Sequence, residues 1–153
     1  MTNLTSGLED YIEEIYIAQI NNKPLKAAEL ARKLNISRAS VSEALAKLVE
    51  KKVINYNRYE TISLTNEGIE KAQKVLEKHN LIEEFFEKVL GIDKKEASEN
   101  ACKIEHIISQ NVLVEIKKFT DFCKNNNDIL ERYKGKEKWL NYHHMGDFWI
   151  SQY

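Results

Sequence analysis

The sequence predicts a mainly α-helical protein in which an N-terminal winged helix-turn-helix is followed by a second, helical domain. Apolar residues recur at helical spacing over most of the chain. One proline and five glycines among 153 residues leave few positions that would break a helix. A predicted pair of short helices is followed by two short segments in which apolar and polar residues alternate, as in β-strands. A chain of this length forms one domain or two small ones.

The N-terminal part of the chain has the pattern of a helix-turn-helix. Residues 8–20 alternate apolar and acidic side chains at helical spacing, and residues 21–24 form a turn. A short helix is predicted over 26–34, and a second one begins after Ser37 and runs to about Lys51. Two short helices joined by a tight turn, the second capped by a small polar residue, predict this motif.

A β-hairpin is predicted directly after the second of these helices. Residues 53–56 and 61–65 alternate as strands, with residues 57–60 between them as the tip. A hairpin in this position is a wing, and Arg58 at its tip is placed to meet a phosphate.

The rest of the chain is predicted to be helical. Thr65 and Asn66 open a helix to about His79, a further helix covers 81–90, and 91–93 is a break. From Lys94 to about Phe122 the pattern fits one long helix or two consecutive ones. We place the domain boundary inside the helix near residues 71–76, which gives domains 1–73 and 74–153.

The C-terminal extension is rich in aromatic residues, which we interpret as a packed cover or a dimer surface. These residues are Tyr133, Trp139, Tyr142, Phe148, Trp149 and Tyr153. We interpret His143 and His144 as surface histidines, because adjacent residues point to different helix faces. Cys123 is predicted to be structural.

Charge is unevenly distributed along the chain. Residues 23–60 hold nine basic and four acidic side chains, a net charge of +5, and the remainder carries −6 of the total −1. A basic segment on an otherwise acidic chain predicts a localised DNA contact. We expect the first turns of the second helix to approach the groove, and basic or aromatic residues to contact phosphate. The predicted DNA-binding residues are Ser37, Arg38, Ala39, Ser40, Ser42, Lys47, Arg58 and Tyr59. Ser37 could also serve simply as a helix cap.

Composition argues against several classes of protein. No apolar run approaches the ~20 residues that span a bilayer, and no signal peptide is apparent. Two cysteines are too few for a disulfide framework. We therefore expect a cytoplasmic protein with free thiols, no membrane partner and no small-molecule substrate.

Potential metal ligands form a second pattern. Cys102, Glu105 and His106 stand at i, i+3 and i+4, which would share one helix face. Thiolate, carboxylate and imidazole are the side chains that most readily bind transition metals. Further candidates are Asp10, Glu13, His79 and Glu83. Taken singly, each has a plainer interpretation: a solvated acidic helix face, a helix-end histidine, or a small buried cysteine.

These blocks together resemble the diphtheria-toxin-repressor-like metalloregulators, which include iron-dependent repressors and manganese transport regulators. The resemblance covers roughly Leu8 to Phe122. It rests on the segments 8–16, 28–31, 37–48, 64–68, 78–83, 91–93 and 101–106. It implies a DNA-binding winged helix, a helical metal-binding and dimerisation domain, and a homodimer that represses transcription on palindromic operator DNA when loaded with Fe(II) or Mn(II).

The resemblance also implies roles for individual residues. Cys102, Glu105 and His106 would form the core of the primary site, with Asp10 as a further ligand, and His79 and Glu83 would serve a neighbouring site. Iron-type members carry methionine at position 10 and histidine at 98, where this chain has Asp10 and Ser98. Manganese-type members keep Asp10 and Glu13 but carry glutamate in place of Cys102. The cysteine tips the expectation towards Fe(II), with Zn(II) or Co(II) able to bind in vitro.

Three further expectations follow. The residues after Phe122 are too few for the SH3-like third domain of longer members. An enzyme of the di-iron bundle class is disfavoured, because it requires Glu-x-x-His motifs that the chain does not have at these positions. A metal-independent winged-helix regulator with a lapsed site stays open as an alternative, because of Ser98.

Overall fold

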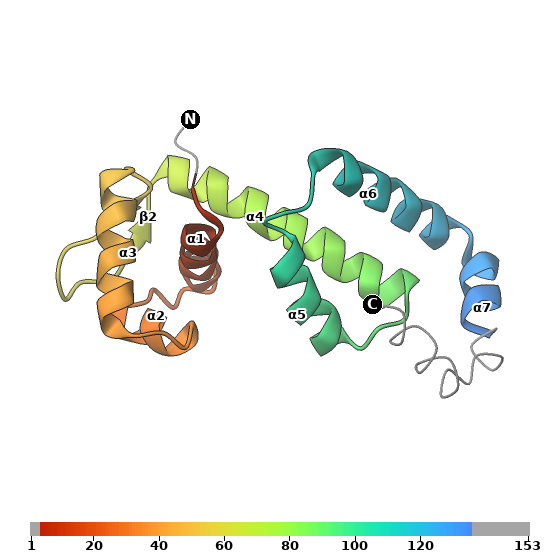
Figure 1. Cartoon of the computed structure of the whole chain (residues 1–153), viewed down its shortest axis with the longest axis horizontal. Coiled ribbons are helices and arrows are strands. Elements are labelled where there is room, and N and C mark those ends of the chain that lie inside the picture. Colours follow the sequence, from red (N-terminus) through yellow and green to blue (C-terminus); the bar gives the residue numbers. More distant parts are fainter. Residues whose placement is uncertain (1–3, 136–153) are drawn as a thin grey trace, which may run out of the picture. The chain divides into compact units, whose positions relative to one another are not determined.

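The computed structural model describes residues 4–135 and is mainly helical, as predicted (Figure 1). Helices α1 (Ser6–Ile20), α2 (Ala27–Lys33) and α3 (Arg38–Glu50) confirm the predicted helix-turn-helix. The Ser37 hydroxyl caps α3 by accepting the backbone N–H of Ser40 at 3.0 Å. The predicted C-terminal features, Trp139, Tyr142, Phe148, Trp149, Tyr153, His143 and His144, lie outside the described residues.

The wing is present but its paired strands are shorter than predicted. Strand β1 (Ile54–Asn55) pairs antiparallel with β2 (Ser63–Leu64), with Ile54 opposite Leu64. A single bridge between Lys26 and Thr61, and the hydrogen bond from Ile62 N–H to the Leu25 carbonyl at 2.9 Å, tie the hairpin to the start of α2. The wing is therefore fixed to the helix-turn-helix at its base.

One apolar core joins these elements. Each of α1, α2, α3 and the hairpin contributes fully buried aliphatic side chains at helical or strand spacing. They include Ile12, Ile15, Leu30, Val41, Leu45, Leu48, Val53 and Ile62. Because α1 lies within this core, any group that holds α1 also acts on the body that carries α3.

The helix after the wing is longer than predicted. Helix α4 (Asn66–Glu84) runs unbroken through Asn80 and continues into a π-helical turn, η1 (Phe85–Val89). The prediction of separate helices meeting near Asn80 was wrong, because neither glycine nor proline stands there to stop the helix. His79 is consequently an interior helix residue and not a helix-end histidine.

Of the two alternatives for the segment from Lys94 to about Phe122, the structure has the two consecutive helices. Helix α5 (Lys94–Ile104) ends before Glu105, and α6 (Gln110–Asn125) begins after Ser109, whose hydroxyl accepts the Val112 N–H. Between them the chain forms a turn held by the Ile107 and Ile108 N–H groups on the Ile104 carbonyl. The prediction that Cys102, Glu105 and His106 share a helix face was therefore wrong.

The chain divides into two compact units. The first contains the residues up to Asn80 together with Ala101–Ile108, and the second contains Leu81–Asn100 with the residues from Ser109 onward. The turn with Glu105 and His106 thus belongs to the same unit as the winged helix, although some 20 residues separate it from that unit in sequence. Within the described residues, no helix combines the length and apolar character needed to cross a membrane.

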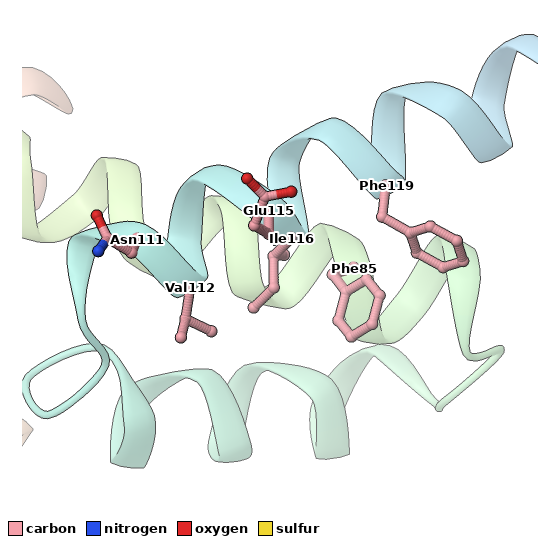
Figure 2. Close-up of a pocket in the computed structure, with 6 residues that line it drawn as sticks. All are labelled: Phe85, Asn111, Val112, Glu115, Ile116 and Phe119. Carbon is pink, nitrogen blue, oxygen red and sulfur yellow. The ribbon is translucent and has the colours of Figure 1, made fainter.

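The second unit is built around α6, which packs against η1 and against α7 (Asn127–Gly135). Cys123 is buried here, as predicted for a structural cysteine. An apolar hollow of about 390 Å³, which we call the α6 groove, opens on this unit (Figure 2). It is lined by Phe85, Asn111, Val112, Glu115, Ile116 and Phe119.

Candidate metal centre

Two groups of potential metal ligands converge in the first unit, and they share Glu105. One group is Asp10, Glu105 and His106; the other is Glu13, His79 and Glu105. In each group one donor atom per residue lies within 4.8 Å of the others. Metal–oxygen and metal–nitrogen bonds of roughly 2.1 Å allow ligands up to about 4 Å apart, so a small closure would suffice. Carboxylate and imidazole donors at this spacing suit divalent transition metals.

Local structure brings these residues together. Asp10 and Glu13 stand three apart on α1 and therefore face the same side. His79 comes from the interior of α4, and Glu105 and His106 come from the turn after α5. The Glu105 N–H still bonds to the Ala101 carbonyl at 2.9 Å, so its side chain continues the face of α5 that buries Ala97 and Ala101, and it is fully buried.

Glu105 is the centre of the arrangement. Its Oε2 lies 2.7 Å from Nδ1 of His79. Its Oε1 lies 3.2 Å from Nε2 of His106, yet among the described residues it has no hydrogen-bond partner. A buried carboxylate oxygen that accepts no hydrogen bond is costly, and a cation bound there would offset that cost. The residues present therefore fit a divalent metal ion.

The electrostatics of the centre are those of crowded carboxylates. Burial, followed by the charge of Glu105, raises the pKa of Glu13 to about 7. Burial opposes the charge on His106, but the hydrogen bond with Glu9 and the charges of Asp10 and Glu105 outweigh it and raise the pKa of His106. Negative charge thus accumulates where the donor atoms meet.

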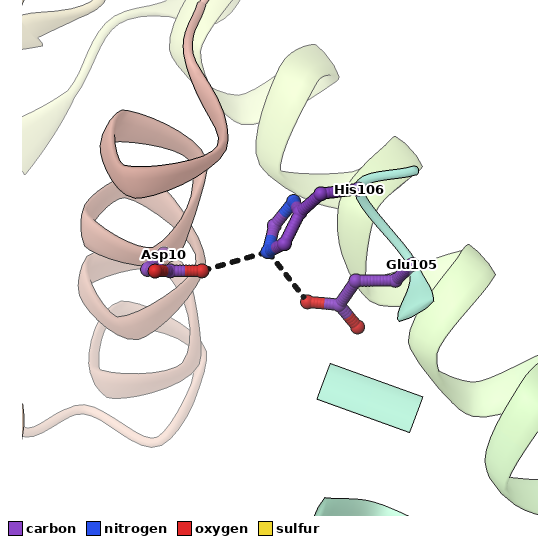
Figure 3. A group of neighbouring side chains, drawn as sticks. All are labelled: Asp10, Glu105 and His106. Carbon is purple, nitrogen blue, oxygen red and sulfur yellow. Dashed lines mark hydrogen bonds and ion pairs between the residues drawn. The ribbon is translucent and has the colours of Figure 1, made fainter. Parts of the chain in front are cut away.

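Glu9 is a contact that sequence reasoning missed. Its Oε2 lies 2.8 Å from Nδ1 of His106, while Oδ1 of Asp10 lies 2.7 Å from Nε2 of the same ring. Figure 3 shows the Asp10 and Glu105 carboxylates meeting at one nitrogen of His106. The sequence did contain a signal for this contact, the two adjacent acidic residues Glu9 and Asp10. A histidine ring has two nitrogens, and each can contact one of two neighbouring carboxylates.

The two convergent groups do not include the remaining predicted ligands. Cys102 is an exposed residue of α5, but partial burial of its thiol, followed by the charges of Glu105 and Asp10, raises the pKa of Cys102. Glu83 is half-buried on α4, one turn after His79. Within the described part of the chain, neither convergent group includes Cys102 or Glu83.

The predicted DNA-binding residues gather on the surface of the same unit. All eight are exposed. Arg38, Ser42, Arg58 and Tyr59 line a hollow of about 460 Å³ between α2, α3 and the wing, together with Lys26, Ala27, Ala28 and Tyr56, which were not predicted. At the tip, the Arg58 guanidinium lies 5.1 Å from the Tyr59 ring centroid.

Besides the cap of α3 by Ser37, two side chains of this set have exposed contacts within the protein. Lys47 pairs with Glu43 at 2.6 Å, and the Ser42 hydroxyl donates to the Arg38 carbonyl at 3.0 Å. Both contacts are exposed, so their donors can exchange them for phosphate at small cost.

A winged helix-turn-helix whose first helix joins a group of potential metal ligands defines a metal-responsive DNA-binding regulator. The sequence matches two family profiles: "Iron dependent repressor, N-terminal DNA binding domain" over residues 3–62, and "Iron dependent repressor, metal binding and dimerisation domain" over residues 65–133. The chain belongs to the iron-dependent repressor family.

Individual relatives agree with this assignment. An HTH-type transcriptional regulator of Methanocaldococcus jannaschii is 43% identical over 122 residues, which are 79% of this chain and 98% of the relative. The HTH-type transcriptional regulator MntR of Listeria welshimeri is 30% identical over 133 residues, 87% of this chain and 93% of MntR.

Solved structures show the same fold. The manganese regulator SloR has a TM-score of 0.67 and 26% identity, covering 79% of this chain and 55% of SloR. A manganese-dependent transcriptional repressor in complex with manganese has a TM-score of 0.69 and 26% identity, covering 75% of this chain and 53% of the repressor. This chain therefore spans about half the length of these two proteins.

Proposed function

We propose that this protein is a transcriptional repressor that binds operator DNA as a homodimer when it is loaded with Fe(II) or Mn(II). One observation carries the proposal: Asp10, on a helix of the winged-helix core, converges with Glu105 and His106 from the turn between α5 and α6. We assign residues 1–73 to DNA binding and 74–153 to metal binding and dimerisation. As a regulator of DNA it would act in the cytoplasm, with neither a catalytic role nor a small-molecule substrate.

In this proposal, the ligands that hold either metal are Asp10, Glu13, His79, Glu105 and His106. When bound, a divalent cation would supply the positive charge that these crowded carboxylates lack. In its absence, burial opposes the ionisation of Glu13 and repulsion from the charge of Glu105 adds to that effect, so the fold favours a protonated Glu13. Asp10 and Glu13 belong to α1, so their engagement with the 105–106 turn acts on the core that positions α3.

DNA would be bound by the exposed face of α3 and by the wing. Small and hydroxyl side chains at 37–42 allow close approach to base edges, whereas Lys47, Arg58 and Tyr59 would contact phosphate. Two recognition helices of a symmetric dimer must lie about 34 Å apart, one turn of DNA. Metal binding would favour the arrangement that meets this spacing.

The experiment is operator binding measured by fluorescence anisotropy, with duplex DNA selected from a random pool in the presence of Mn(II). We expect Mn(II) or Fe(II) to raise the affinity about 5–150-fold, the usual range of such coupling. Glu105→Gln should abolish this increase, whereas Glu99→Gln, an equal charge change at an exposed position, should preserve it. Equal operator affinity in metal and in chelator would contradict the proposal and favour a metal-independent regulator.

The choice between the metals depends on Cys102. Oxygen and nitrogen donors alone suit Mn(II), while a thiolate favours Fe(II), Co(II) or Zn(II). We propose that Fe(II) is the stronger activator only through Cys102, whose sulfur would join the ligands, with Glu83 serving the neighbouring site. Anaerobic titrations of Cys102→Ser should then lose the preference for Fe(II) and keep activation by Mn(II). An unchanged Fe(II) response would remove Cys102 from the site.

A further inference from the structure

We propose that Glu9 is a positioning residue of the metal centre, whose carboxylate accepts the Nδ1–H of His106 and leaves the Nε2 lone pair for the ion. This inference rests on the proposed metal-dependent function and names the residue that orients its histidine. Glu9 would thus set how well His106 binds metal without itself being a ligand.

The geometry separates the two ring nitrogens of His106. Nε2 lies 2.7 Å from Asp10 and 3.2 Å from Glu105, and both of these residues belong to the convergent group (Figure 3). Nδ1 lies 2.8 Å from Oε2 of Glu9, which belongs to neither group. The ring therefore presents one nitrogen to the ligands and the other to Glu9.

A neutral imidazole carries one N–H and one lone pair, so ligation through Nε2 requires the proton on Nδ1. A carboxylate at Nδ1 stabilises that tautomer, makes the ring a stronger electron donor and fixes its orientation. Glu9 meets these requirements, because the His106 side chain is 8% exposed and that of Glu9 24%, which limits competition from water. Asp10, at 41% exposed, remains accessible on the opposite side of the ring.

The sequence position of Glu9 gives the contact a further consequence. Glu9 and Asp10 are neighbours on α1, so both nitrogens of His106 engage the same helix. The turn after α5 is therefore fastened to α1 at His106 before any ion binds. Removal of the Glu9 carboxylate would leave all proposed ligands in place. It would weaken metal binding because the orientation of the His106 ring would no longer be fixed.

The test measures Mn(II) affinity of the full chain by calorimetry for Glu9→Ala and Glu9→Gln. We expect the alanine variant to bind Mn(II) about 10–100-fold more weakly, as is usual when a partner of a ligating histidine is removed. The glutamine variant should recover most of this loss, because its amide oxygen also accepts from Nδ1–H. Glu70→Ala and Glu70→Gln, on an exposed site of the same unit, are the matched controls and should bind as the parent does.

A spectroscopic readout separates positioning from simple structural support. In the Zn(II)-loaded protein, which is diamagnetic, the His106 Nδ1 proton should give a slowly exchanging NMR signal in the parent and in Glu9→Gln, and should lose it in Glu9→Ala. Unchanged affinity in Glu9→Ala would overturn the inference while leaving the proposed function intact. Equal losses in both Glu9 variants would also overturn it, since Glu9 would then be a ligand. A parent chain that binds no Mn(II) would overturn the proposed function itself.

Discussion

Glu13 has a buried carboxyl group whose ionisation the metal-free fold opposes. Its pKa rises from 4.5 to about 7, so the folded protein holds this proton more tightly than the unfolded chain does. This tighter proton binding stabilises the fold fully at pH values below the pKa that Glu13 has in the unfolded chain. The stabilisation is lost as the pH rises through the pKa that Glu13 has in the folded protein. The raised pKa of His106 acts in the same direction.

We therefore predict that the metal-free protein loses stability between about pH 5 and about pH 8. Glu13→Gln should remove part of this slope and be more stable than the parent at the upper end, with little difference at the lower end. Urea unfolding followed by circular dichroism in the presence of a chelator measures both. Parallel pH profiles for the two proteins would contradict the assigned cause.

Gly68 stands where the first turn of α4 meets the hairpin. A Cβ atom at this position would lie 1.9 Å from the Val53 carbonyl oxygen, which already accepts the Thr65 N–H at 3.0 Å. The obstacle is backbone, so neither a rotamer change nor a small shift of a side chain relieves it.

We predict that Gly68→Ala lowers the free energy of unfolding by about 1–3 kcal/mol, the usual cost of overpacking. Gly7 provides the control, because nothing lies within 4 Å of a Cβ atom there. Gly7→Ala should be neutral or stabilising by up to ~1 kcal/mol through helix propensity. Urea unfolding at a fixed pH measures the free energy of unfolding of both variants. Equal values for Gly68→Ala and Gly7→Ala would contradict the predicted backbone clash.

For individual residues, the sequence indicates which side chains are potential metal ligands but not which of their atoms come into contact. Asp10, Glu13, His79, Glu105 and His106 were candidates on residue type and spacing, and the structure brings them together. The pairing of Glu9 with His106 joins residues 97 positions apart, a contact that no local pattern contains.

Among the elements, those with strong local signals were predicted well. The cap at Ser37, the helical spacing of α1 to α3 and the alternation of the wing are all encoded within about a dozen residues. The errors occurred where tertiary packing decides. Helix α4 passes through Asn80, where the polar sequence suggested a junction. The choice between one helix and two after Lys94 stayed open, because no breaker marks the end of α5 at Ile104.

Helix α6 exposes large apolar side chains on the groove side, which a monomer would leave in water. Val112 is 49% exposed and Phe119 is 50% exposed, and the Phe119 ring contacts Phe85 at a centroid distance of 6.4 Å. Exposed apolar patches of this kind mark interaction surfaces. We propose that the α6 groove belongs to the homodimer interface.

Phe119→Asp should then shift the protein from dimer towards monomer, because dimerisation would bury an unpaired charge. Val114→Asp is the matched control: Val114 is 41% exposed on the same helix but does not line the groove. Sedimentation velocity across a concentration series gives the dissociation constant of each. A dimer equally stable in both variants would place the interface elsewhere.

For the whole molecule, the charge distribution and the metal centre have complementary roles. The basic segment 23–60 provides long-range attraction to DNA, while the acidic remainder keeps the chain close to neutral. Attraction of this kind does not depend on metal. In the mechanism proposed above, regulation comes from the coupling between metal binding at α1 and the position of α3, and such coupling is reciprocal.

Reciprocity gives a prediction that needs no substitution. If saturating Mn(II) raises operator affinity by a given factor, the operator must raise the Mn(II) affinity of the protein by the same overall factor, because both describe one thermodynamic cycle. Calorimetric Mn(II) titrations with and without the selected operator measure the second factor, and anisotropy measures the first. Random duplex DNA of equal length is the control, since charge attraction alone should enhance Mn(II) binding far less. An operator that leaves Mn(II) affinity unchanged would show that metal and DNA bind independently, and the centre would then stabilise the fold without regulating it.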